Sequence, residues 1–192
     1  RSQFIKKFIR TETERLKRAG FSGMIIHYPS SPITVEETIK AMTEIYNPNG
    51  VKIYLETPSS NPERALLNSP EKINELFEKI PDNIRNGFGL CIDTAHMFSS
   101  GCKISSYEDA RILLDGIDLS PDDVMIHLND NLNSFGTGSD IHAPLTYGKI
   151  WEDYKGDFRK SGLFAFLEYI YEHNTITILE RSSLQEVEVD IQ

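Results

Sequence analysis

The sequence predicts a parallel α/β fold. Segments whose apolar residues recur at helical spacing alternate along the chain with short apolar segments of strand character, and five such short segments occur. This alternation is typical of strands that are joined by crossover helices and lie parallel in one sheet. The 192 residues are 39% hydrophobic and 26% charged, an ordinary globular composition without a linker or repeat. We therefore expect one domain over residues 1–192.

Each expected element follows from its own spacing and its own capping residues. Thr34 with Glu37 forms a capping-box pattern, Ser69 with Pro70 opens another helix, and Ser106 caps a third. The segment FAFLEYIYE suits either a helix or a strand, and its apolar spacing favours a helix. The expected helices cover residues 3–19, 35–45, 70–80, 107–114 and 164–172. The expected strands are SGMIIH (22–27), VKIYLE (51–56), GLCID (89–93), DVMIHL (123–128) and TITILE (175–180).

Composition and charge narrow the classes of function. No run of about 18 apolar residues occurs, and the N-terminus lacks the apolar segment of a signal peptide, so we expect a soluble, cytoplasmic protein without a membrane partner. Cys91 and Cys102 are the only cysteines and are expected to be structural thiols of a reducing compartment. The formal charge of −9 argues against nucleic-acid binding through a broad basic surface. That objection weakens if several carboxylates hold metal ions.

Every expected strand ends in, or one residue after, a side chain that can bind a metal ion. Singly, such a carboxylate usually caps the next helix, and a lone histidine usually lies in the core. In a parallel α/β fold, however, all these strand ends meet at one edge of the sheet, where like charges repel unless cations neutralise them. Imidazoles and carboxylates without a thiolate suit catalytic Zn²⁺, with Mn²⁺ or Fe²⁺ as alternatives. The residues are His27, Glu56, Asp93, His127 and Glu180.

A second group of candidate ligands lies near the first. His96 follows Asp93 by three residues, and alternation in an extended Asp140-Ile141-His142 segment would aim two side chains at one ion. The small-residue loop 97–101 is expected to form part of the exposed rim. His173 is expected to be structural, and Glu168 to lie on the surface or between two helices.

The segments GLCIDTAHMFSSG, IHLND, SDIH and ILE follow one another in this order along the chain. Together they resemble the signature segments of the endonuclease IV family of apurinic/apyrimidinic (AP) endonucleases, most closely the branch found in large cytoplasmic DNA viruses. The resemblance covers nearly the whole chain. It implies a TIM (β/α)8 barrel, of which this chain supplies about the C-terminal five βα units. The first three strands and one histidine ligand of such a barrel are absent from this sequence, so we expect a fragment of a longer protein, with completion of the barrel by another chain as the alternative.

The resemblance also implies a site with three zinc ions. Glu56 would bridge two metals, and His27 would help to hold the first. The second metal would be completed by Asp93, His127 and Glu180, and the third would be held by His96, Asp140 and His142. Asn129 and Asp130 would contact and orient these ligands without binding a metal themselves. Ile141 and Ala143 depart from the family, which often has Arg and a polar residue at these positions.

The implied activity is base-excision repair of duplex DNA by a monomeric protein. The phosphodiester 5′ to an abasic site would be hydrolysed to leave a 3′-hydroxyl, with Glu56, Asp93, His127 and Glu180 as the catalytic residues. Three zinc ions would offset six of the nine net negative charges. These cations would be concentrated at the position that the DNA phosphate must occupy.

Two other functions remain open from the sequence. A sugar isomerase or epimerase of the xylose isomerase-like superfamily would use the strand-end residues alone and would have no role for His96, Asp140 and His142. A non-catalytic DNA-binding or scaffold remnant would keep these ligands but lack the histidine of the third strand.

Overall fold

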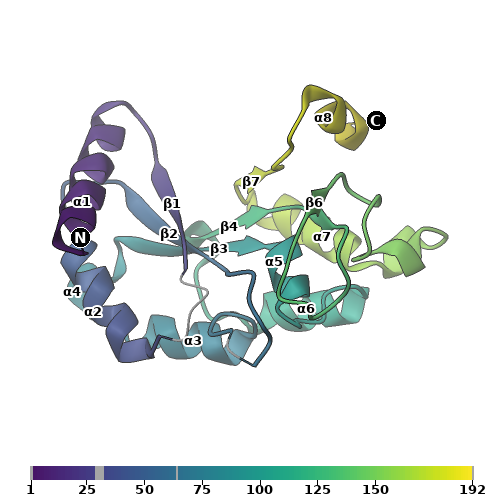
Figure 1. The fold of residues 1–192 in the computed structure, drawn as a ribbon, viewed down its shortest axis with the longest axis horizontal. Coiled ribbons are helices and arrows are strands. Elements are labelled where there is room, and N and C mark those ends of the chain that lie inside the picture. Colours follow the sequence, from purple (N-terminus) through teal and green to yellow (C-terminus); the bar gives the residue numbers. More distant parts are fainter. Residues whose placement is uncertain (1, 29–32, 64, 192) are drawn as a thin grey trace.

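The computed structural model describes residues 2–28, 33–63 and 65–191. Its centre is a five-stranded parallel sheet in the order β1-β2-β3-β4-β7, with helices beside it (Figure 1). The strands of this sheet are β1 (Gly23–His27), β2 (Lys52–Glu56), β3 (Phe88–Asp93), β4 (Val124–His127) and β7 (Thr177–Ile178). A separate antiparallel pair consists of β5 (Asp130–Asn131) and β6 (His142–Ala143). The expected parallel α/β class and all five expected strands are therefore confirmed.

The helices lie where the caps and the apolar spacing predict them, with three additions. Thr34 makes both hydrogen bonds of its capping box, and Ser69, Ser106 and Ser161 each accept a hydrogen bond from a first-turn amide. The ambiguous segment 164–172 is helical, within α7. The helices are α1 (Ser2–Arg18), α2 (Val35–Ile45), α3 (Pro70–Glu78), α4 (Asp82–Arg85), α5 (Thr94–Ser99), α6 (Tyr107–Gly116), α7 (Gly162–His173) and α8 (Leu184–Ile191), with short 3₁₀ turns η1 (Pro121–Asp123), η2 (Glu152–Tyr154) and η3 (Phe158–Lys160). The three additions, which no sequence pattern predicted, are α4, α5 and α8.

Alternation along the strands separates two faces of the sheet. Ile53, Leu90 and Ile126 belong to the main core, which packs against α2, α3, α6 and α7. On the opposite face, Tyr54, Cys91 and Met125 form a small cluster of their own. Both cysteines are buried and unpaired, as expected. Four of the five strand-end donors follow this second face: Glu56, Asp93 and His127 lie two residues beyond members of the small cluster, and His27 lies two residues beyond Ile25.

The segment after β3 corrects one expectation. Residues 97–101 were expected to form an exposed rim loop, but Thr94–Ser99 is a helical turn and its side chains are buried. The Asp93 carboxylate caps this helix by accepting a hydrogen bond from the backbone N–H of His96 at 2.8 Å. The cap turns the chain inward, so Met97, Phe98 and Ser99 pack inside the molecule.

The last strand is also shorter than expected. The spacing of residues 175–180 predicted one strand, but β7 spans only Thr177–Ile178, and Glu180 lies just beyond it. The ladder with β4 ends because β4 itself ends at His127. The amide of Glu180 donates instead to the side-chain oxygen of Asn129 at 3.1 Å.

The N-terminal helix α1 has about the predicted extent, and several of its apolar side chains are exposed. Phe4 is 75% exposed, and Ile5 and Phe8 are each 54% exposed. An apolar hollow of about 340 Å³ lies between α1 and α2, lined in part by Ile9 and Met42. Among the described residues, no helix combines the length and apolar composition that crossing a membrane requires.

Gly162, the first residue of α7, packs closely against the backbone of the segment before α6. Its N–H donates to Ser105 O at 2.7 Å, and a Cβ at this position would lie 1.8 Å from the backbone oxygen of Ile104. Because backbone cannot yield as a side chain does, Gly162→Ala should lower the free energy of unfolding by about 3 kcal/mol or more in urea denaturation. Gly156→Ala, where nothing lies within 4 Å, is the control and should change it by less than about 0.5 kcal/mol. Equal stability of the two variants would contradict this packing.

Candidate metal centre

The register of the sheet brings the strand-end donors together. His27 lies level with Glu56 in the β1–β2 ladder, and Asp93 lies level with His127 in the β3–β4 ladder. Glu56 is level with Cys91, so Asp93 extends two residues, or about 6.6 Å, further along its strand. The donors therefore form a staggered row at one edge of the sheet.

The first group of donors surrounds Nδ1 of His127. This atom lies 3.2 Å from Glu56 Oε1, 3.7 Å from Asp93 Oδ2 and 3.3 Å from Glu180 Oε2. Glu56, Asp93 and His127 are buried, and the Glu180 side chain is 40% exposed. These four residues form one of two compact groups of potential metal ligands among the described residues.

The second compact group consists of Asp93, His96 and His142, and the Asp140 carboxylate lies beside its two histidines. Asp140 Oδ2 lies 3.4 Å from His96 Nε2 and 3.3 Å from His142 Nε2. His142 Nε2 also lies 3.7 Å from Asp93 Oδ2, so Asp93 stands between the two groups. The antiparallel β5–β6 pair, in a segment that was expected to be a loop, holds His142 in this position.

His27 lies at the margin of the site. Its Nε2 is 3.4 Å from Glu56 Oε2, and its side chain is 79% exposed. Its ring centroid lies 6.0 Å from that of His96. His27 therefore contacts the second oxygen of Glu56, whereas His127 contacts the first.

The spacing and chemistry of these atoms fit zinc. Zinc bonds of about 2.0–2.1 Å in a tetrahedron place neighbouring donors about 3.3–3.4 Å apart. The neighbouring donors lie 3.2–3.7 Å from His127 Nδ1 and 3.3–3.4 Å from Asp140 Oδ2, and the ligand atoms of each compact group lie within 4.8 Å of one another. His142 Nε2 is buried and has no hydrogen-bond partner, although it faces two carboxylates. A buried ring nitrogen without a partner is costly unless it binds an ion. The residues present therefore fit a metal centre.

Burial, neighbouring charges and hydrogen bonds shift the pKa values of the histidines and carboxylates of the site. Burial lowers the pKa of His96, but Asp140, Asp93 and Glu56 outweigh it and raise the pKa to about 9. Hydrogen bonding to His127 lowers the pKa of Glu180 to about 2 despite partial burial. Burial raises the pKa of Asp93, because its carboxylate is removed from water.

Neighbouring groups fix the orientation of the ligands. His96 Nδ1 lies 2.8 Å from the carbonyl oxygen of Thr57, so this nitrogen donates its proton and Nε2 is left to face Asp140. The Thr57 hydroxyl accepts a hydrogen bond from the Asp93 amide at 3.0 Å. No sequence pattern pointed to Thr57, because its role depends on a contact between neighbouring strands.

Asn129 and Asp130 differ in what they contact. Asn129 Nδ2 donates to Asp93 Oδ2 at 2.7 Å and to Glu180 Oε2 at 3.3 Å, and so joins two candidate ligands. The Asp130 carboxylate accepts hydrogen bonds from the backbone N–H groups of Asn131, Gly148 and Ile150. Asp130 thus orders the segment after β6.

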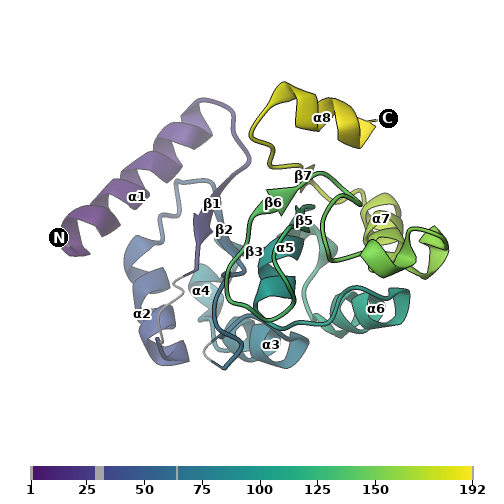
Figure 2. The same ribbon diagram turned by 45° about the vertical axis from the view of Figure 1, so that its right-hand side comes forward.

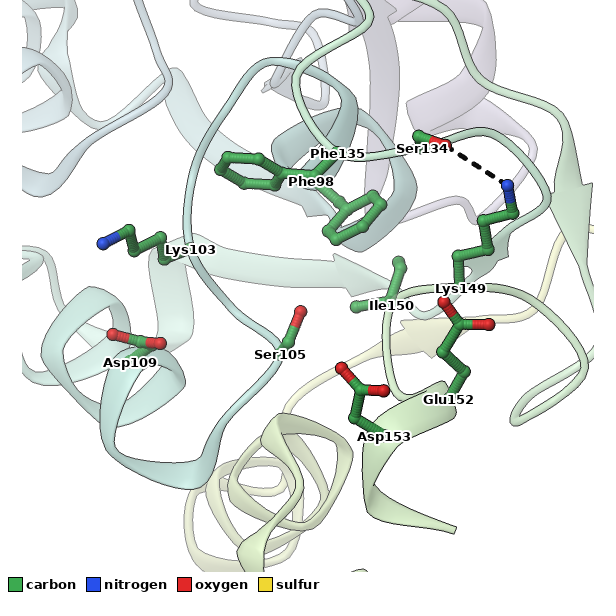
Figure 3. A pocket seen from close by; sticks show the side chains of 10 residues that line it. All are labelled: Phe98, Lys103, Ser105, Asp109, Ser134, Phe135, Lys149, Ile150, Glu152 and Asp153. Carbon is green, nitrogen blue, oxygen red and sulfur yellow. Dashed lines mark hydrogen bonds between the residues drawn. The ribbon is translucent and has the colours of Figure 1, made fainter.

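The loop that carries Asp140 is docked on α5. Phe135 packs edge-on against Phe98 with ring centroids 5.3 Å apart, and the N–H groups of Gly136 and Gly138 donate to carbonyl oxygens of α5. Figure 3 shows the two rings beside a hollow of about 370 Å³, at whose edge Ser134 accepts a hydrogen bond from Lys149. None of the eight candidate donors lines this hollow.

A larger hollow of about 840 Å³ is lined by five of the eight candidate donors. Its wall combines donor side chains with the half-exposed apolar side chains of Leu132 and Ile141. The lining residues are His27, His96, Leu132, Asp140, Ile141, His142, Leu179, Glu180, Arg181, Ser182 and Glu186.

Two residues that were not expected to bind a metal ion lie away from this hollow. His173 is exposed at the end of α7, and its ring lies near that of Tyr169. Glu168 accepts a hydrogen bond from the Tyr107 hydroxyl at 2.8 Å, between α6 and α7. Both positions agree with a structural or surface role.

Metal binding at this site should release protons at pH 7. With a pKa near 9, His96 is protonated in the metal-free protein at pH 7, and zinc requires the neutral imidazole. The apparent zinc affinity should therefore rise with pH up to about 9 and then level off. Calorimetric titration in two buffers of different ionisation enthalpy would count the protons, and His96→Asn should release fewer. Zinc binding without proton release at pH 7 would contradict this protonation state.

Known proteins share this fold and much of this sequence. The family model described as xylose isomerase-like TIM barrel matches residues 1–187. A probable AP endonuclease of African swine fever virus is 39% identical over 187 residues, which cover 95% of this chain and 62% of the relative. The crystal structure of AsfvAP:AG matches with a TM-score of 0.90 and 37% identity, covering 100% of this chain and 65% of that one.

Endonuclease IV from Thermus thermophilus shares the fold, with a TM-score of 0.71 at 21% identity over 95% of this chain and 64% of that one. The chain thus spans less than two thirds of the length of these relatives. Its five parallel strands form a half-barrel, as expected for the C-terminal units of a (β/α)8 barrel. This chain belongs to the xylose isomerase-like TIM barrel family.

Proposed function

We propose that this chain carries most of the active site of a zinc-dependent AP endonuclease. The enzyme would hydrolyse the phosphodiester 5′ to an abasic site in duplex DNA and leave a 3′-hydroxyl, as a step of base-excision repair. The observation that carries the proposal is the pair of donor groups at the carboxyl edge of the sheet, in each of which the ligand atoms lie within 4.8 Å of one another and which share Asp93. The similarity to a viral protein named a probable AP endonuclease supports it.

Each group of residues has a distinct part in this proposal. Glu56, Asp93, His127 and Glu180 would hold one zinc ion, and His96, Asp140 and His142 another. Glu56 also faces His27, with which it would share a third. Bound zinc supplies Lewis acidity, which lowers the pKa of water towards neutrality and stabilises negative charge on a phosphate.

The protein itself would bind and orient the substrate. The donors lie at one side of an open hollow, so a phosphate placed there is near several of them at once. Leu132 and Ile141 are 47% and 55% exposed beside these donors and offer apolar surface to the carbon face of a deoxyribose. With the metals bound, DNA would be attracted to the site rather than to a basic surface.

The second donor group argues against a sugar isomerase. A site for moving protons on a keto sugar needs only the first group, yet His96 and His142 both converge on Asp140. Three buried or partly buried ionisable groups are costly to hold together without a function.

Residues 1–192 would form part of one barrel domain, because the half-barrel of the described residues leaves its sheet open. The protein would act as a monomer in the cytoplasm, with Mn²⁺ able to replace zinc.

A duplex with one abasic-site analogue tests the function of the full chain. The metal-loaded protein should cut 5′ to the analogue, and a chelator should abolish cutting. Glu56→Gln should lower the cutting rate by at least about 100-fold, because its two carboxylate oxygens face His27 and His127 and would hold two metal ions. Glu168→Gln is the matched control, since Glu168 contacts Tyr107 away from the donors, and it should cut within about two-fold of the wild type.

Failure of the metal-loaded protein to cut the analogue would contradict the proposal. So would equal rates for Glu56→Gln and the wild type. Conversion of a keto sugar instead of cutting would favour the isomerase.

A further inference from the structure

A buried ion pair lies directly behind the candidate ligands. Arg181 Nε donates to Asp190 Oδ2, and the two side chains are only 1% and 0% exposed. Asp190 lies in α8, which lies beyond the end of β7 (Figure 2). The second oxygen of Asp190 accepts a hydrogen bond from the Leu145 amide at 2.6 Å. Asp190 therefore ties α8 to Arg181 and to the segment after β6.

The other donors of the Arg181 guanidinium are also engaged. Its Nη1 donates to Asn129 Oδ1 at 2.7 Å and to the Glu180 carbonyl at 2.8 Å, and its Nη2 donates to the Leu128 carbonyl at 3.3 Å. These contacts need the planar, forked donor set of arginine. A lysine would keep the charge but would not reach all of these acceptors at once.

These contacts fix which way the Asn129 amide points. Arg181 Nη1 and the Glu180 N–H both donate to Asn129 Oδ1, so this atom must be the amide oxygen. The amide nitrogen then faces Asp93 Oδ2 and Glu180 Oε2. A flipped amide would place its oxygen against two carboxylates and its nitrogen against a guanidinium.

We propose that Arg181, held by Asp190, is a positioning residue of the metal centre that acts through Asn129. This inference rests on the proposed metal site. Arg181 keeps the Asn129 amide in the one orientation that donates to Asp93 and Glu180, and these hydrogen bonds hold both carboxylates towards His127. The C-terminal helix α8 is then part of the support of the site.

Stability alone does not account for this pair. A buried ion pair is often no more stabilising than apolar residues of the same volume, because both charges lose their water. Arg181 also directs a donor to the side chain that contacts two candidate ligands. Loss of such supporting contacts typically weakens metal binding by about 10- to 100-fold.

Arg181→Lys tests the proposal in the full chain. The zinc affinity should fall about ten-fold in competition with a chromophoric chelator, because the lysine keeps the charge beside Asp190 but frees the Asn129 amide. Arg111→Lys is the matched control, since Arg111 pairs with Asp115 on the surface of α6, and it should leave the affinity unchanged. Unchanged zinc affinity in a folded Arg181→Lys variant would overturn the proposal.

A second pair of variants separates positioning from general destabilisation. In an Asn129→Ala background, Arg181→Lys should have no further effect on the zinc affinity, since the group it acts through is gone. An equal loss in both backgrounds would overturn the proposal. The readout is metal affinity, so an uncut abasic duplex would count against the proposed function and not against the role of Arg181.

Discussion

Two buried carboxylates at neighbouring strand ends constrain everything around them. Glu56 and Asp93 are 2% and 0% exposed, and burial without partners would cost each of them several kcal/mol. Imidazoles and the Asn129 amide surround them, and Asp93 also caps α5. Bound cations would complete this compensation, because they neutralise carboxylates that the imidazoles can only partly neutralise.

The same constraint explains the loops beyond the strands. Asp140 and His142 reach the centre because Phe135 and the amides of Gly136 and Gly138 dock their loop on α5. Asp93 at the end of β3 caps α5. This helix carries His96 and supports the loop with Asp140, so the end of β3 holds both a ligand of its own and the support of two others. Asp130 then orders the next segment, which delivers the Leu145 amide to Asp190. Each of these contacts positions the segment that makes the next one, beginning at the end of β3.

The fold and most of the candidate site could be predicted from features that act locally. Strand alternation and helix caps depend on neighbouring residues, so the five strands and the caps at Thr34, Ser69 and Ser106 were predictable. The helical turn after Asp93 was missed, because the small residues in GLCIDTAHMFSSG favour a loop unless the carboxylate caps the turn. The end of β7, the exposure of α1 and the pairing of Arg181 with Asp190 depend on distant contacts that spacing does not encode.

Anomalous diffraction from zinc-loaded crystals would locate the bound ions independently of any activity. We expect one ion at bonding distance, about 2.0–2.2 Å, from His127 Nδ1 and the carboxylates of Glu56, Asp93 and Glu180. We expect another at that distance from Asp140 Oδ2 and the Nε2 atoms of His96 and His142. Zinc only at other surface positions, with these donors left unbound, would contradict the assignment of a metal centre to this edge of the sheet.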